Sequence, residues 1–170
     1  MEKKNTIRVT PAGTLVWRGK TYHCALGKSG VTDSKQEGDG ATPAGIFPLR
    51  EVFYRPDRLP APETDLPISE LVQSDGWCDD PNHPAYNKKI TLPHAGRYEE
   101  LWREDAIYDV IIIIGYNDNP SRQNQGSTIF LHIAREAYQP TEGCVALKRE
   151  DLLEILKDLT PGSQIEISAN

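Results

Sequence analysis

Cysteine is scarce in this sequence, with Cys24, Cys78 and Cys144 the three copies among 170 residues. So low a content excludes a disulfide-dense scaffold, in which bridges take the place of a hydrophobic core. An odd number also leaves at least one thiol unpaired. A bridge between Cys24 and Cys78 stays open for an oxidising compartment. Because connectivity does not follow from sequence, we expect two unrelated, semi-buried thiols instead.

Long hydrophobic runs and clusters of basic residues are also lacking. The longest apolar run, Val110–Ile114, is far too short to span a bilayer, so no transmembrane segment is expected. The first residues are polar and show no signal peptide, which by itself predicts a cytoplasmic protein. A formal net charge of −6 with no lysine or arginine run argues against a nucleic-acid partner or an anionic membrane surface.

Internal repeats and low-complexity tracts are absent, and the chain is long enough for one self-sufficient core. We therefore predict a single, monomeric domain over residues 1–170, with roughly 70% of the unfolded surface buried. Six prolines fall between Pro56 and Pro84. They predict a proline-rich, irregular insertion around residues 50–105, of a length that is usually functional.

The predicted insertion carries aromatic residues that suit a flap over a cleft. Trp77, Tyr86 and Tyr98 are candidates for the cleft wall, with a small core within the flap as the alternative. Residues 99–105 are predicted to form a short helix.

Most of the remaining chain has strand patterns. Residues 7–10 alternate, and residues 14–17 and 21–26 flank a glycine turn at Arg18-Gly19-Lys20, which predicts a hairpin. The β-branched run from Asp109 to Asn117 lacks alternation, which is typical of a strand buried on both faces. Further strands are expected at residues 127–133 and 164–168.

One helix is clear. Leu152, Ile155, Leu156 and Leu159 follow helical spacing, and Pro161-Gly162 ends the pattern. The predicted fold class is therefore mainly β, a sandwich or partly closed barrel with one or two peripheral helices.

A histidine and a cysteine lie close together in the sequence near its end. His132 lies on the predicted strand 127–133, on the face opposite Ile129, Leu131 and Ile133, and Cys144 lies on the turn just after it. A thiol attacks an acyl carbon as the thiolate, and histidine is the side chain best suited to take its proton. Gly143 and Cys144 also offer backbone N–H groups for a developing oxyanion. The pattern predicts a cysteine acyl-transfer site, with packing residues as the alternative.

A second segment strengthens this prediction. Thr42-Pro43-Ala44-Gly45-Ile46-Phe47, followed by His132 and by Thr141-Glu142-Gly143-Cys144-Val145, resembles the L,D-transpeptidase catalytic domain, also called the YkuD domain. The resemblance extends from about Thr14 to Ile167 and is closest to a short, divergent branch of the family. Pro43 and Gly45 favour a role for the first segment in shaping a loop rather than in chemistry.

Two positions depart from the better-known family members, which have a histidine before the glycine and an arginine two residues after the cysteine. Glu142 and Ala146 occupy these positions here. A carboxylate near the sulfur would raise the pKa of the thiol. Sequence leaves the orientation of Glu142 open, and the binding function of the missing arginine does not carry over.

The resemblance implies an enzyme that acts on peptidoglycan stem peptides without a cofactor or metal. It assigns Cys144 as the nucleophile that forms a thioester with release of D-alanine, His132 as the base, and a backbone carbonyl as the group that orients the imidazole. The acceptor, whether a stem amine, water, a D-amino acid or a protein, stays open. A hydrolase on the same fold, a thiol peptidase of another fold and a non-catalytic wall-binding module are the alternatives. The family also implies the cell envelope, and the sequence reveals no export route.

Substrate-binding residues are harder to choose. Thr141 lies in the cysteine motif, and Tyr116 and Asn117 end the buried strand beside the His132 strand. Arg55, Arg58 and Arg122 are candidates for the carboxylates of the donor peptide, with surface ion pairs as the alternative.

A metal site is the last candidate. Cys78, Asp79, Asp80, His83 and His94 are metal-ligating residue types, but their spacing matches no standard zinc pattern and Asp-Pro-Asn-His-Pro suits a turn. We expect no metal.

Overall fold

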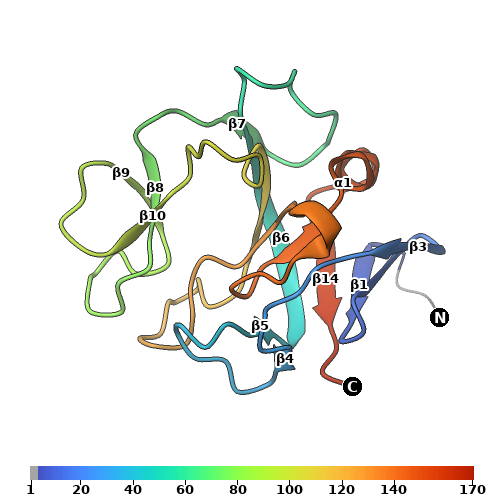
Figure 1. The fold of residues 1–170 in the computed structure, drawn as a ribbon, viewed down its shortest axis with the longest axis horizontal. Coiled ribbons are helices and arrows are strands. Elements are labelled where there is room, and N and C mark those ends of the chain that lie inside the picture. Colours follow the sequence, from blue (N-terminus) through green and yellow to red (C-terminus); the bar gives the residue numbers. More distant parts are fainter. Residues whose placement is uncertain (1–3) are drawn as a thin grey trace.

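One large sheet dominates the molecule (Figure 1). The structure, a computed structural model, describes residues 4–170. The strands of the sheet follow the order β13-β12-β11-β6-β14-β1-β2-β3, and β7 pairs with β6. Their bounds are Thr6–Thr10 (β1), Thr14–Trp17 (β2), Lys20–His23 (β3), Gly45–Tyr54 (β6), Ile68–Glu70 (β7), Val110–Ile114 (β11), Phe130–Ile133 (β12), Val145–Leu147 (β13) and Gln164–Ile167 (β14).

The two edges of this sheet approach each other just beyond β3. Ala25 and Ala146 exchange two backbone hydrogen bonds, of 2.8 Å and 3.0 Å. Gly27 and Thr141 form a second bridge. The sheet is therefore almost closed on itself, which confirms the predicted mainly β, partly closed barrel. Ala25, Gly27, Thr141 and Ala146 are called the closing seam below.

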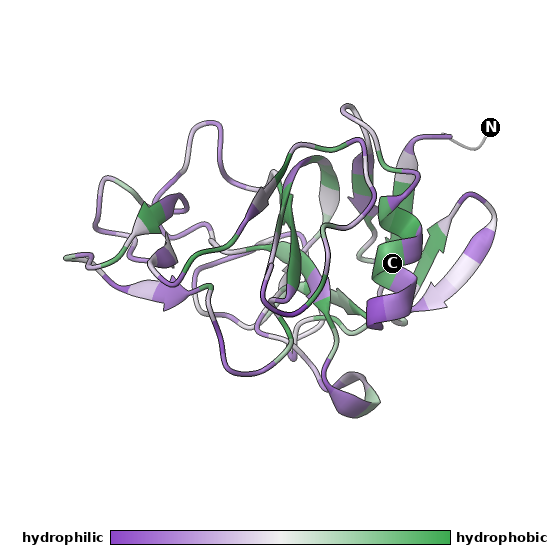
Figure 2. Ribbon diagram, turned by 90° about the horizontal axis from the view of Figure 1, so that it is seen from above, coloured by the Kyte–Doolittle hydropathy of each residue, from purple (hydrophilic) through white to green (hydrophobic). Residues whose placement is uncertain are grey.

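The main core lies inside the barrel and explains the strand patterns. All five residues of β11 are buried, with Val110, Ile112 and Ile114 in the main core and Ile111 and Ile113 in a second cluster on the other side. A strand buried on both faces has no need of alternation. Apolar residues accordingly follow the central strands in Figure 2.

The one α-helix among residues 4–170, α1 (Arg149–Leu156), packs onto the main core with the predicted face. Leu152, Ile155, Leu156 and, just beyond the helix, Leu159 all join the main core. A short 3-10 element, η1 (Glu136–Tyr138), precedes β13. Among residues 4–170, no helix is both long and apolar enough to cross a membrane.

The proline-rich segment is more regular than predicted. Strand β6 continues to Tyr54, and β7 follows within the segment. A separate three-stranded sheet, the small sheet, has the order β10-β8-β9 and consists of β8 (Asp75–Cys78), β9 (Lys89–Thr91) and β10 (Tyr98–Glu100). The helix predicted at residues 99–105 is wrong, because Tyr98, Glu99 and Glu100 pair with β8.

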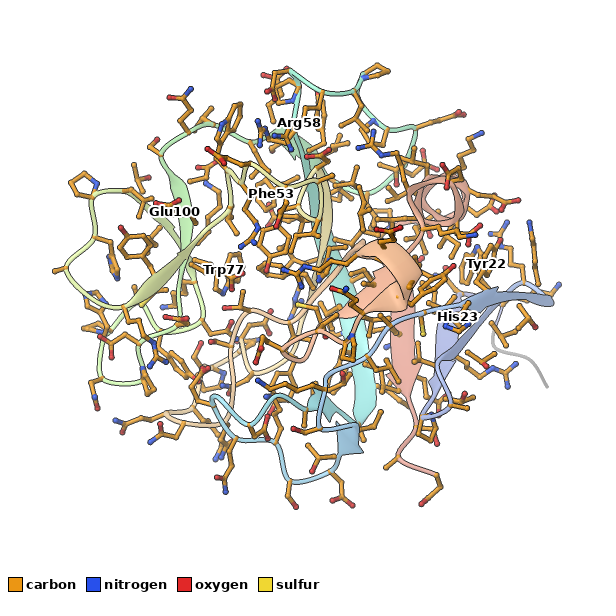
Figure 3. The ribbon with its side chains drawn as sticks, in the orientation of Figure 1. Tyr22, His23, Phe53, Arg58, Trp77 and Glu100 are labelled. Atoms are coloured by element: carbon orange, nitrogen blue, oxygen red, sulfur yellow. The ribbon has the colours of Figure 1, made fainter. Side chains whose placement is uncertain are left out.

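The small sheet lies beside the barrel and packs against it through the second cluster. Trp77 of β8 and Phe53 of β6 belong to this cluster, and Figure 3 places both between the small sheet and the barrel. The Trp77 and Phe130 rings meet edge to face at 5.1 Å. The contact fixes the small sheet against the strand that carries His132.

The segment of residues 27–45 contains a two-strand pair, β4 (Val31–Thr32) and β5 (Thr42–Pro43). Thr42 is fully buried, and its Oγ1 accepts a 2.9 Å hydrogen bond from the Gly27 N–H at the closing seam. Thr42 therefore shapes the barrel rather than the chemistry.

All three cysteines are free. Cys24 belongs to the main core and Cys78 to the end of β8, so the alternative of a bridge between them is wrong.

Candidate active site

Cys144 lies directly before β13, at the edge of the barrel beside β12. The two strands run parallel, and His132 is opposite Ala146 in their register. The Phe130 N–H donates a 3.4 Å hydrogen bond to Cys144 Sγ. Both Cys144 and His132 are buried, with 7% and 3% of their surface exposed, and both line one cavity. The predicted nucleophile and base are therefore brought together at one wall.

The resting thiol is held away from solvent by a strained backbone. Cys144 Sγ donates a 3.2 Å hydrogen bond to the carbonyl oxygen of Thr128. Thr128 has a φ of 59°, in the left-handed region that β-branched residues rarely adopt, at a cost of about 1–3 kcal/mol. Its N–H is fixed by Asn87 Oδ1 at 3.1 Å, and Asn87 Oδ1 also accepts a hydrogen bond from Trp77. The small sheet thus helps to fix the Thr128 carbonyl, which accepts the hydrogen bond of the Cys144 thiol.

The imidazole of His132 is oriented by its own backbone neighbour. His132 Nδ1 lies 2.9 Å from the carbonyl oxygen of Ile133. A carbonyl can only accept, so Nδ1 carries the proton and Nε2 keeps its lone pair. The Tyr108 ring packs against the imidazole with centroids 5.3 Å apart. His132 is therefore in the tautomer that a general base requires.

Burial keeps both groups uncharged at rest. It raises the pKa of the Cys144 thiol to about 12, with a smaller raising effect from the Glu99 carboxylate and a lowering effect from the Phe130 N–H. Burial also lowers the pKa of His132 to about 4. A preformed thiolate–imidazolium pair is therefore disfavoured in this arrangement.

The turn before the cysteine is organised by one hydroxyl. Thr141 Oγ1 donates to the Cys144 carbonyl at 2.7 Å and accepts from the Gly143 N–H at 3.0 Å. The Gly143 N–H is thus already used, while the Cys144 N–H donates to nothing among residues 4–170. Gly143 has a φ of 143°, and a Cβ there would lie 2.8 Å from the Ala41 carbonyl. Only glycine fits this turn without strain.

The cavity has a volume of about 440 Å³ and a mixed charge. Four cationic and four anionic side chains line it: Lys35, Arg97, Arg103, Arg135, Glu37, Asp79, Glu99 and Glu142. Most of them are paired, as in the ion pairs Arg97–Asp79 and Lys28–Glu142. Among residues 4–170, Arg135 forms no ion pair, although its charge is close enough to lower the pKa of His132, behind burial as the main cause.

Glu142, whose orientation the sequence left open, extends outward. Its side chain is 80% exposed and pairs with Lys28 at 3.0 Å. Glu99 is the carboxylate that affects the thiol. It lies in the cavity wall, accepts a hydrogen bond from the Tyr108 hydroxyl, and has its own pKa raised by burial.

Several predicted substrate-binding residues lie elsewhere. Arg55 is buried between Asp57, the Arg103 carbonyl and the Trp102 ring, and Arg58 binds Asp109. Asn117 accepts from the Arg122 N–H and ties its own loop together. Tyr116, Asn117, Arg55, Arg58 and Arg122 are not among the residues that line the cavity, whereas Thr141 is. Of the predicted aromatic wall residues, Tyr98 lines it and Trp77 and Tyr86 do not.

Sequence reasoning missed Tyr108, Glu99, Lys35 and Arg135. These residues come from separate loops and from the small sheet, and only the tertiary fold brings them to one wall. Arg135 follows the His132 strand at short range, which is the one local signal that was available.

The fold and site define a mainly β protein with a cysteine and a histidine at one cavity. The family profile described as "YkuD: L,D-transpeptidase catalytic domain" matches residues 2–167. The chain therefore belongs to the YkuD family of L,D-transpeptidase catalytic domains. No curated protein matches the chain.

Solved structures of L,D-transpeptidases are also similar to it. L,D-transpeptidase 1 of Mycobacterium tuberculosis is 13% identical over 96% of this chain and 58% of its own, with a TM-score of 0.44. An L,D-transpeptidase from Mycobacterium smegmatis is 12% identical over 98% of this chain and 59% of its own, with a TM-score of 0.47. L,D-transpeptidase 3 of M. tuberculosis, in complex with a faropenem-derived adduct, is 14% identical over 96% of this chain and 59% of its own, with a TM-score of 0.44. The chain thus spans less than two thirds of these enzymes, and at such scores the likeness adds nothing to the family assignment.

Proposed function

We propose that the protein is a cysteine acyltransferase of peptidoglycan stem peptides, an L,D-transpeptidase that forms a thioester at Cys144 and releases D-alanine. One observation carries the proposal. A buried thiol and a histidine with a fixed tautomer lie on adjacent strands and line the same cavity, in a chain of the YkuD family.

Acylation begins when the thiol leaves the Thr128 carbonyl and turns toward His132. Because both groups are uncharged at rest, proton transfer to His132 Nε2 accompanies the attack of sulfur on the amide carbon. The Cys144 N–H, which has no acceptor among residues 4–170, is the donor available to the oxyanion. His132 then protonates the departing amine of D-alanine, which leaves a thioester.

Deacylation reverses the proton path. The amine of a second stem peptide attacks the thioester, His132 takes the amine proton, and the thiolate receives it as the new amide forms. Water in place of the amine gives a shortened peptide, so the same site supports carboxypeptidase activity. The product distinguishes the two.

The charges of the cavity fit a substrate with both ionised amines and carboxylates. Arg135 is exposed beside His132 and forms no ion pair within residues 4–170, so it is free to bind a donor carboxylate. It would take the place of the family arginine that is absent at Ala146, a residue that is fully buried in the closing seam.

The test is incubation of the purified protein with disaccharide-tetrapeptide muropeptides, followed by mass spectrometry. We expect cross-linked dimers and free D-alanine from the wild type and neither from Cys144→Ala or His132→Ala. Cys24→Ser is the matched control, because Cys24 is also buried but lies in the main core. Tripeptide and D-alanine without dimers would assign a carboxypeptidase instead. Stem binding that survives Cys144→Ala with no turnover of the wild type would contradict an enzyme and favour a wall-binding module.

Intact-mass analysis with a carbapenem gives a second readout of the nucleophile. One covalent adduct is expected on the wild type and on Cys24→Ser, and none on Cys144→Ala.

A further inference from the structure

A cysteine and two histidines meet at one end of the small sheet, away from the thiol–histidine pair. Cys78 ends β8, His83 lies in the β8–β9 connection, and His94 lies between β9 and β10. One potential ligand atom of each lies within 4.8 Å of the others. The His83 and His94 rings are 4.4 Å apart, centroid to centroid. Three ligating side chains from three separate segments therefore converge.

His94 has an unsatisfied nitrogen at this point. His94 Nε2 is buried and has no hydrogen-bond partner in the structure. A buried polar atom left without a partner costs about 1–3 kcal/mol, and native proteins contain few of them. A ligand that accepts the nitrogen lone pair would remove that cost.

Gly96 leaves space beside the same groups. A Cβ at this position would lie 3.0 Å from Asp80 Oδ2, 3.1 Å from His83 Cδ2 and 3.2 Å from His94 Nε2. Its φ is not in the left-handed region, so the backbone angle does not require glycine. The absence of a side chain keeps open a space bordered by a carboxylate and two imidazoles.

We propose that Cys78, His83 and His94 bind a divalent metal ion of the zinc type, with the Asp80 carboxylate near them. Thiolate and imidazole are the donors that a borderline-soft ion such as Zn²⁺ prefers. A tetrahedral zinc site places such donors about 3.5 Å apart, so the cluster needs to contract by about 1 Å at its widest. Cys78-x4-His83-x10-His94 is no standard zinc spacing, which is why the sequence offered these residues as a candidate set but predicted no metal there.

The three ligands differ in how free they are to bind. His83 Nδ1 already accepts a 2.9 Å hydrogen bond from the Ala85 N–H, so its ring has a competing partner. The Asp80 carboxylate accepts from the N–H groups of Asn82 and Arg97. Cys78 and His94 are therefore the principal ligands, and His83 is the weaker one.

Metal binding would connect the loops that support one wall of the candidate active site. Asp79 follows Cys78 directly in the chain, and the segment 97–99 follows His94 closely. Four residues of these two segments line the 440 Å³ cavity: Asp79, Arg97, Tyr98 and Glu99. The ion would then join the two segments that present these residues. The proposal does not depend on the acyl-transfer function, because its first readout is metal content.

The decisive experiment measures metal bound to the full chain after removal of any affinity tag. Chelator-treated protein is dialysed against zinc chloride, and the bound metal is measured by mass spectrometry. We expect one zinc per chain in the wild type, none in Cys78→Ser and His94→Ala, and weakened binding in His83→Ala and Gly96→Ala. Cys24→Ser, Cys144→Ala and His23→Ala are the matched controls and are expected to keep one zinc.

Cobalt(II) chloride gives an independent readout of the donor set. The wild type is expected to develop a thiolate-to-cobalt charge-transfer band that Cys78→Ser lacks and Cys144→Ala retains. Zinc is also expected to raise the thermal midpoint of the wild type but not of His94→Ala, a test that remains valid if Cys78→Ser folds poorly. A wild type that binds no zinc, or a site that survives both Cys78→Ser and His94→Ala, would overturn the proposal.

Discussion

At the scale of single residues, the proposed chemistry depends on two groups that are uncharged when the substrate is absent. The Cys144 thiol donates a hydrogen bond to the Thr128 carbonyl, and His132 has a free Nε2 but a pKa lowered by burial to about 4. The site therefore differs from thiol enzymes in which a thiolate–imidazolium pair is formed in advance. In the proposed mechanism, activation comes with substrate binding, which displaces the thiol from the Thr128 carbonyl.

The first prediction concerns the pH dependence of thiol reactivity. Burial raises the pKa of Cys144 to about 12, so the thiolate fraction increases about tenfold per pH unit between pH 7 and 10. Alkylation of Cys144 by iodoacetamide, measured by peptide mass mapping, should follow that slope. A plateau near neutral pH would instead reveal a preformed thiolate.

The second prediction concerns Arg135. Arg135→Ala should raise KM for the tetrapeptide donor about fivefold. The effect is modest because the side chain is exposed, so that solvent screens its ion pair with the donor carboxylate. Arg18→Ala, which removes an exposed arginine of the β2–β3 turn, should leave KM unchanged. An unaltered KM for Arg135→Ala would remove this residue from the binding site.

At the scale of elements, the turn from Thr141 to Cys144 decides where the sulfur lies. The Thr141 hydroxyl makes two hydrogen bonds inside the turn, and the Thr141 backbone is anchored to Leu26 and Lys28 across the seam. The motif threonine thus acts through Cys144, as a positioning residue. A hydroxyl with both donor and acceptor function is needed, and threonine and serine alone supply it on so short a side chain.

Thr141→Val tests this assignment, because it keeps the shape and removes the hydroxyl. We expect a loss of about 1–3 kcal/mol in unfolding free energy and about 10- to 100-fold in acylation rate. Thr141→Ser should restore both. Rates that fall without rescue by serine would point to the methyl group and to packing. Carbapenem acylation followed by intact mass gives the rate, and denaturant unfolding gives the stability.

At the scale of the whole molecule, closure of the sheet places the site. The edges of the barrel meet at Ala25 and Ala146, and Ala146 lies two residues beyond Cys144. A Cβ on Gly27, which lies in this seam, would be 2.4 Å from the Gly40 carbonyl. The seam therefore tolerates no side chain there, and backbone on both sides would have to move.

Gly27→Ala should lower the unfolding free energy by about 1–3 kcal/mol and loosen the seam. Hydrogen exchange provides the measurement with an internal control. The amides of Ala25 and Ala146 should exchange faster, while those of the buried strand β11 keep their protection. Uniform acceleration would mean global destabilisation rather than opening at the seam.

The sequence by itself determined the features that depend on local pattern. The run Val110–Ile114, the helical spacing of Leu152 to Leu159 and the alternation at residues 164–168 each follow from the geometry of one element, and the fold class followed from them. The motif placed Cys144 beside His132 because strand and turn are adjacent in the chain. The tertiary structure decided what distant segments contribute. It placed the Thr128 carbonyl and Glu99 close to the thiol and Arg135 close to His132. It also placed Arg55 and Arg58 in other contacts and gathered Cys78, His83 and His94. Such contacts depend on closure of the large sheet and on the docking of the small sheet against it. Neither arrangement follows from a periodic pattern in the sequence.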